Sequence, residues 1–234
     1  MNLRIARRAL GSALVLGVTV LGAGLGANAQ TKTSVPKKTS SAATKATTAA
    51  PKAAIPADMT AYKAHGFESA PIRLEVFSDF QCPACRELYQ QTLRPVMDNY
   101  VSAGKVYLIH RDMPLQTHQY SRVAARYANA AARLRKLDRV MDALFGKQEV
   151  WSADGSVDAV VASVLTAADM NRVRQMVQNG ELEAAIDKDV SLATKYRVMQ
   201  TPTTVITYKG QSYPVVGVVS YAILKTFLEQ LLRQ

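Results

Sequence analysis

Hydrophobic residues follow two patterns of spacing along this chain of 234 residues, and each pattern predicts one type of secondary structure. Short runs rich in β-branched and aromatic residues, bounded by turn residues, predict strands. Longer stretches in which apolar residues recur every three or four positions predict helices. The two patterns follow one another in three zones, so the chain is predicted to combine a sheet with helices.

The first zone predicts two strands joined by one helix. Residues 72–77 form a strand run that begins after Pro71. Residues 82–100 have helical spacing, with Pro83 at the first helical position, where its missing N–H costs nothing. Residues 105–110 predict the second strand. A strand–helix–strand order of this kind predicts a parallel pair with a right-handed crossover.

The second zone, about 118–196, has no strand pattern and predicts a block of helices. We expect these helices at residues 121–137, 139–145, 156–166, 171–178 and 182–196. The third zone returns to strands, which are predicted at 203–208 and 213–219 around a turn at 209–212. A terminal helix with one apolar face is predicted at 221–232.

The N-terminus carries the pattern of a secretory signal peptide rather than of a folded element. Three arginines in the first eight residues precede an apolar stretch from Leu10 to Leu25, and Ala27-Asn28-Ala29 resembles a cleavage site. We therefore predict that residues 1–29 are removed after export. The alternative is an uncleaved membrane anchor, although the stretch is short for a bilayer span, which needs about 20 residues.

Residues 30–57 consist mainly of Thr, Lys, Ala, Ser and Pro, with no aromatic or acidic residue. Such a segment buries too little apolar surface to fold, so we predict a flexible tether. The full chain has 29 basic and 18 acidic residues. Eight of the basic residues lie before Asp58, which leaves residues 58–234 with a net charge of only +3. This near balance argues against a nucleic-acid partner. We expect residues 58–234 to form one domain.

The only two cysteines of the chain form the motif Cys82-Pro83-Ala84-Cys85. A disulfide stabilises a fold more as its loop lengthens, and this loop holds two residues. The pair is therefore predicted to carry chemistry. Half of a zinc site is one alternative, but zinc needs four ligands and the three histidines show no matching spacing. An inert disulfide is the other.

The chain resembles the DsbA-like thiol-disulfide oxidoreductases of the thioredoxin-fold superfamily over residues 70–232. The resemblance rests on residues 76–85 (VFSDFQCPAC), the helical block, and Thr201-Pro202-Thr203 before a strand. It implies an α/β thioredoxin fold, a central mixed sheet flanked by helices, with an inserted all-helical domain at about 118–196. It also implies no metal and no cofactor besides the redox-active cysteine pair.

The resemblance implies a role for each residue of the motif. Cys82 is the expected nucleophile, with a pKa lowered by the helix N-terminus. Cys85, one turn further, is expected to be buried and to act as the resolving thiol. Pro202 matches a cis-proline that faces the cysteines and leaves the backbone of Thr201 free to pair with substrate. The alternative for Pro202 is a trans proline that opens a strand.

Other positions are less specific. An acid matching Glu75 lies below the active site in the family, so burial is expected to raise its pKa and suit it to proton transfer. The alternative is a solvent-facing glutamate. Phe80 is expected to pack or to contact substrate, beside Asp79. His110 and His118 are expected to be structural.

The implied function is the introduction of disulfides into unfolded or reduced exported proteins, in a periplasm or outside the cell. The implied partners are those substrates and a membrane protein that recycles the cysteine pair. Ala84 replaces the histidine of the best-known oxidases, which predicts a weaker oxidant. No separate dimerisation domain is present, so we expect a monomer and not an isomerase. The alternatives are a reductase or isomerase of the same compartment, and a non-catalytic chaperone or peptide-binding module.

Overall fold

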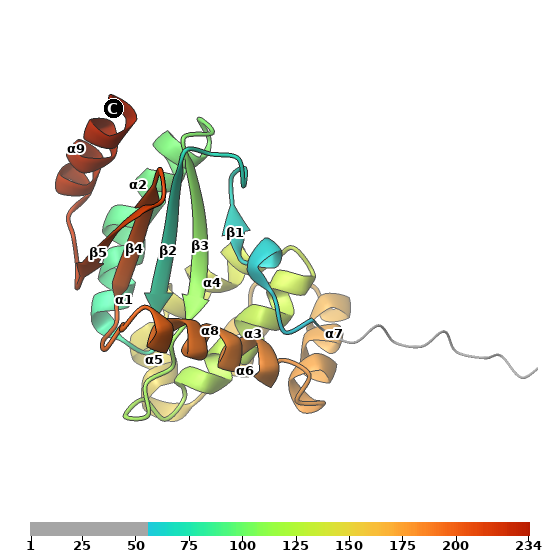
Figure 1. Ribbon diagram of the computed structural model, residues 1–234. Coiled ribbons are helices and arrows are strands. Elements are labelled where there is room, and N and C mark those ends of the chain that lie inside the picture. The colour runs from blue at the N-terminus through green and yellow to red at the C-terminus, as the bar shows by residue number, and fades with distance from the viewer. Residues whose placement is uncertain (1–55) are drawn as a thin grey trace, which may run out of the picture. The chain divides into compact units, whose positions relative to one another are not determined.

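The computed structural model describes residues 56–234 (Figure 1). The predicted signal peptide, residues 1–29, and nearly all of the predicted tether, 30–57, lie outside the described residues. None of the helices within 56–234 has both the length and the apolar character needed to cross a bilayer.

A five-stranded mixed sheet forms the centre of the domain, with the strand order β1-β3-β2-β4-β5. The strands are β1 (Ala64–His65), β2 (Ile72–Ser78), β3 (Val106–Asp112), β4 (Thr203–Tyr208) and β5 (Gln211–Val216). The β2 and β3 strands are parallel, as the strand–helix–strand order predicted, and the other pairs are antiparallel. The central strand β2 is thus paired on both sides.

The connection from β2 to β3 is a helical stretch with two irregular turns. It consists of α1 (Pro83–Leu88), a π-helical turn (Tyr89–Leu93), α2 (Arg94–Val96) and a second π-helical turn (Met97–Val101). Pro95 lies between the two wide turns. A proline inside a helix removes one hydrogen bond and crowds the preceding turn, and widened turns relieve that crowding.

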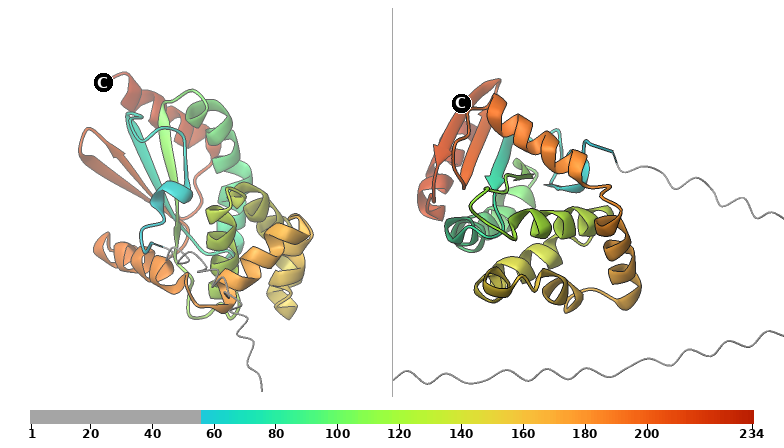
Figure 2. Two further views of the ribbon diagram at one scale, coloured as in Figure 1. Left: turned by 90° about the vertical axis from the view of Figure 1, so that its right-hand side faces the viewer. Right: turned by 90° about the horizontal axis from the view of Figure 1, so that it is seen from below.

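Six helices follow β3 and one ends the chain. They are α3 (Ser121–Arg133), α4 (Leu137–Gly146), α5 (Gln148–Asp154), α6 (Val157–Ala162), α7 (Ala167–Gln178), α8 (Glu183–Lys195) and α9 (Tyr221–Leu232). Figure 2 shows the block of α3 to α7 at one end of the sheet. The fold is therefore the helix-flanked mixed sheet with a helical insertion that the sequence predicted.

The two faces of the sheet are covered by different helices because side chains alternate along β2. Ile72, Leu74 and Val76 belong to the main core, together with residues of α1, α2 and α9. Phe77 lies in a second cluster on the opposite face, with Ala193 of α8. The sheet thus has a mainly apolar face toward α1, which also carries His110 and Thr204, and a mixed face toward α8.

Some element bounds differ from the predicted ones for local reasons. The predicted helix 121–137 ends at Arg133 because Arg135 adopts a left-handed backbone (φ 58°), and α4 starts at Leu137. The last hairpin turns at Lys209 and Gly210, both with positive φ, so β5 begins at Gln211 rather than at 213. The short strand β1 and helix α5 were not predicted.

Candidate active site

The cysteine pair lies after the turn that connects β2 to α1, at the N-terminus of the helix. Cys82 is the N-cap residue, with extended backbone angles (φ −77°, ψ 121°), and Pro83 takes the first helical position. Cys82 is 7 % exposed and Cys85 only 1 % exposed, and both are free thiols. The expected burial of Cys85 is confirmed.

The surroundings of Cys82 favour its thiolate form. Its pKa is lowered from 9.0 to about 6, chiefly because the Cys85 thiol donates a hydrogen bond to it, while burial acts in the opposite direction. The backbone N–H groups of Cys85 and Ala84 add to the effect. Both N–H groups lie in the first helical turn, and the Cys85 N–H also donates to the Cys82 carbonyl oxygen at 3.1 Å. The direction of the predicted shift is thus confirmed, but its largest cause is the Cys85 thiol and not the helix N-terminus.

The second thiol behaves in the opposite way. Burial raises the pKa of Cys85, and hydrogen bonding to the neighbouring Cys82 sulfur raises it further. Cys85 therefore stays protonated and keeps its proton available as a hydrogen-bond donor. The two thiols therefore differ in protonation: Cys82 forms a stable thiolate and a good leaving group, whereas Cys85 is a neutral hydrogen-bond donor.

The loop before β4 faces the nucleophile. The Thr201–Pro202 peptide bond is cis, as predicted, rather than the trans alternative. The Cys82 Sγ lies 3.6 Å from the carbonyl oxygen of Thr201. The Pro202 carbonyl in turn accepts a hydrogen bond from Gly217 N (2.8 Å), which ties the loop to the end of β5.

A third segment, which the sequence did not point to, also reaches the pair. Gln148 of α5 is buried and its Nε2 donates to the carbonyl oxygens of Phe80 (2.7 Å) and Cys82 (3.0 Å). This side chain fixes the turn ahead of α1 against the helical block. A lone glutamine between two predicted helices gave no signal for this contact.

Exposed apolar side chains lie on α5, on the loop before β4 and at the end of β5, close in sequence to residues that contact the cysteine turn or the cis-proline loop. Val150 follows Gln148 on α5, Met199 precedes Thr201, and Val216 and Val218 flank Gly217. Their exposed fractions are 59 %, 87 %, 60 % and 39 % respectively. Exposed apolar side chains on these segments are a candidate contact surface for a partner.

Phe80 lies in the core rather than at the surface. Its side chain is 1 % exposed and packs between His110 and Phe145, with both ring-centroid distances 5.1 Å. Of the two roles that the sequence left open for Phe80, its burial supports packing. His110 is a partner in that packing, which agrees with the expected structural role.

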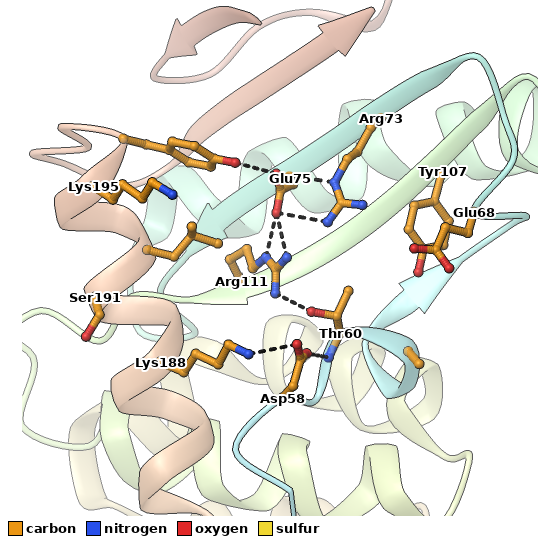
Figure 3. A pocket seen from close by; sticks show the side chains of 13 residues that line it. Asp58, Thr60, Glu68, Arg73, Glu75, Tyr107, Arg111, Lys188, Ser191 and Lys195 are labelled. Atoms are coloured by element: carbon orange, nitrogen blue, oxygen red, sulfur yellow. Dashed lines mark hydrogen bonds and ion pairs between the residues drawn. The ribbon is translucent and has the colours of Figure 1, made fainter. Parts of the chain in front are cut away.

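Glu75 is buried as expected, with 2 % exposed, so the solvent-facing alternative is wrong. Figure 3 shows it between Arg73 and Arg111. Arg111 Nε donates to its carboxylate at 2.9 Å, and the hydroxyl of Tyr196 donates at 3.1 Å. These residues line a cavity of about 620 Å³ on the α8 face of the sheet.

The expected raised pKa of Glu75 is wrong. Burial alone raises it, but the hydrogen bonds and the charge of Arg111, together with Arg73, outweigh burial and hold the pKa below its ordinary value. Glu75 is an ion-pair partner in the structure, and within residues 56–234 its hydrogen bonds go to Arg73, Arg111 and Tyr196. Its role in proton transfer stays a prediction.

Within residues 56–234, His, Cys, Asp and Glu side chains form no group of three or more that could hold a metal ion. The arrangement suits chemistry by the thiols themselves. A low-pKa thiolate at a helix N-terminus, a neutral thiol behind it and a peptide carbonyl beside it are the parts that dithiol–disulfide exchange needs.

Comparisons with known proteins agree with this geometry. The family model described as thioredoxin matches residues 58–214. A curated relative, the probable disulfide bond formation protein D of Bacillus cereus, is 24 % identical over 150 residues, which cover 60 % of this chain and 68 % of that protein.

Two solved structures share the fold. The α-DsbA1 protein of Wolbachia pipientis has a TM-score of 0.62 at 20 % identity and covers 72 % of this chain and 89 % of its own. Oxidised BdbD of Bacillus subtilis has a TM-score of 0.59 at 20 % identity, and the match covers 74 % of this chain and 93 % of that protein.

Proposed function

Because the chain belongs to the thioredoxin family and is a DsbA-like thiol-disulfide oxidoreductase, we propose that it introduces disulfide bonds into exported proteins. The observation that carries this direction of electron flow is the lowered pKa of Cys82. A stabilised thiolate favours the reduced form of the pair and makes Cys82 a good leaving group, so the disulfide form is an oxidant.

The reaction proceeds through a mixed disulfide. A substrate thiolate attacks the Cys82 Sγ of the Cys82–Cys85 disulfide, and the sulfur of Cys85 leaves with the electron pair of that bond. Cys85 then takes up a proton, which its raised pKa favours. A second substrate thiolate attacks the substrate sulfur, and Cys82 leaves as a thiolate. The substrate loses two thiols and gains one disulfide, and the pair is reduced.

The surroundings of Cys82 support an extended, partly apolar peptide as the substrate. The Thr201 carbonyl lies beside the sulfur and can accept a hydrogen bond from a peptide backbone. Val150, Met199 and Val216 are exposed apolar side chains on α5, on the loop before β4 and at the end of β5, and can offer apolar contacts. Unfolded proteins present both features, whereas folded proteins bury them.

We also propose that the protein works outside the cytoplasm, in a periplasm or on the outer face of the cell envelope. The support is the predicted signal peptide at residues 1–29. A pair that has donated its disulfide must be oxidised again, and a membrane redox partner is the proposed source. The pair itself is the only redox group that the mechanism needs.

The test uses the oxidised protein in stoichiometric amount with a reduced, unfolded protein that has one native disulfide. We expect the substrate to lose two free thiols while Cys82 and Cys85 gain them. The Cys82→Ser variant should be inactive, and the Cys85→Ala variant should accumulate a mixed disulfide when mixed with an oxidised substrate. If the protein instead reduces a substrate disulfide and oxidises no thiols, it is a reductase. If Cys82→Ser retains full activity, the redox function is wrong.

A further inference from the structure

The residue that contacts both cysteines through its backbone is Asp79, three positions before Cys82. Its carbonyl oxygen accepts a hydrogen bond from Cys82 N (3.1 Å), and its own N–H donates to Cys85 Sγ (3.4 Å). Any movement of residue 79 therefore changes the surroundings of both sulfurs. The sequence placed Asp79 beside the site but gave it no role.

The Asp79 side chain is anchored on the opposite side of the turn. The residue is 1 % exposed, and its carboxylate accepts four hydrogen bonds. One comes from Gln81 N (2.7 Å), within the turn itself. The others come from Leu115 N (2.8 Å), His118 Nδ1 (2.8 Å) and Ser121 Oγ (2.5 Å).

Three of these four donors lie at or just before the start of the helical insertion. Leu115 and His118 lie in the connection between β3 and α3, and Ser121 is the first residue of α3. Gln81 reinforces the link, since its Oε1 accepts from Tyr120 N at 2.8 Å. The insertion thus holds the turn before α1 through one buried carboxylate.

We propose that Asp79 is a positioning residue for the cysteine pair: its anchored carboxylate holds the backbone N–H against the Cys85 sulfur, which aims the Cys85 proton at Cys82. The hydrogen bonds then run in one direction, from Asp79 N–H to the Cys85 sulfur and from the Cys85 S–H to the Cys82 sulfur. Chains of this kind polarise one another, so the first bond strengthens the second.

The positioning role of Asp79 rests on the proposed function only in that Cys82 and Cys85 are taken as a redox pair. Asparagine at position 79 keeps the size of the side chain but places an NH₂ group where one carboxylate oxygen accepts from a backbone N–H, that of Gln81 or that of Leu115. Donor then faces donor, and the anchor is weakened. Loss of the negative charge of Asp79 by itself would lower the pKa of Cys82, because a nearby negative charge disfavours the thiolate.

The experiment titrates the thiolate absorbance of the reduced protein near 240 nm and the rate of alkylation of Cys82. For Asp79→Asn we expect the pKa of Cys82 to rise by roughly half a unit to one unit, a three- to tenfold loss of thiolate relative to thiol. Ser121→Ala, which keeps the charge and removes one anchor, should give a smaller shift in the same direction. Asp158→Asn is the control, since Asp158 pairs with Arg174 and Tyr127.

A pKa of Cys82 that is unchanged or lower in Asp79→Asn overturns the proposal. Should that variant fail to fold, Ser121→Ala decides, and an unchanged pKa in Ser121→Ala then overturns it. Neither readout uses a protein substrate. A wild-type protein that fails to oxidise substrates while the variants shift as expected would refute the proposed function and leave the positioning role intact.

Discussion

Replacing Cys85 with alanine removes the hydrogen bond that contributes most to the low pKa of Cys82. That pKa is about 6, compared with 9.0 for an unperturbed thiol, and the Cys85 thiol is the largest cause of the shift. A hydrogen bond to a charged group contributes about 1.5–3 kcal/mol. At about 1.4 kcal/mol per pKa unit, its loss raises the pKa by roughly one to two units.

The expected pKa of Cys82 in Cys85→Ala is therefore about 7 to 8. At pH 7 the thiolate fraction falls from about nine tenths to between about a tenth and a half. The variant has a single cysteine, because the chain has only two, so absorbance near 240 nm reports on Cys82 alone. The pH dependence of iodoacetamide alkylation gives an independent value.

Cys85→Ser is the matched control. A serine hydroxyl is smaller than the thiol but can still donate a hydrogen bond to Cys82, so the pKa of Cys82 in this variant should stay within about half a unit of the wild-type value. Alanine and serine variants that both titrate near the wild-type pKa would refute the reasoning. The lowered pKa would then come from the helix N-terminus without help from Cys85.

Three further predictions follow from the same structure. The pKa of Cys82 in the folded protein (about 6) lies below its unfolded value of 9.0, so the thiolate stabilises the reduced protein fully above pH 9 and this stabilisation is lost as the pH falls to 6. The free energy of unfolding of the wild type minus that of Cys82→Ser should therefore rise with pH between 6 and 9, by up to about 1.4 kcal/mol per pH unit. Lys63→Met leaves the carboxylates of Asp112 and Asp189 buried without their shared cation, which should cost about 3–5 kcal/mol in urea unfolding. Ala84→His adds a cation beside the thiolate and should raise the reduction potential by about 30 mV or more in glutathione buffers.

Each of the three has an outcome that contradicts it. The pH prediction fails when the wild-type and Cys82→Ser curves run parallel from pH 6 to 9. Lys188→Met is the control for Lys63→Met, because Lys188 pairs with the exposed Asp58 and its replacement should cost under about 1 kcal/mol of stability. Equal losses of stability in the two lysine variants would argue against the buried cluster. A potential that is unchanged or lower in Ala84→His would contradict the role given to Ala84.

The sequence predicted the features that depend on local order along the chain. Cys82 at a helix start, Pro83 at the first helical position and the strand at 203–208 each follow from residues within a few positions of one another. The type of the Thr201–Pro202 bond was predicted through the family resemblance. These features need no knowledge of which strands lie side by side.

The features that the sequence missed depend on contacts between distant segments. Glu75 meets Arg111, 36 positions away, because the parallel register places Glu75 opposite Ile109 and so brings residue 111 to the same face. The sequence shows neither the register nor the face, so it could not give the sign of the pKa shift. The contact of Gln148 with the turn before α1 depends in the same way on how α5 packs.

The reduction potential of the Cys82–Cys85 pair tests the central claim most directly. It is measured by equilibrating the protein in glutathione buffers of defined ratio and counting free thiols by mass tagging. A disulfide donor with a low-pKa nucleophile and alanine at position 84 should lie between thioredoxin, about −270 mV, and DsbA, about −120 mV. A value at or below that of thioredoxin would contradict the account, because the pair would then donate electrons to substrates instead of taking them.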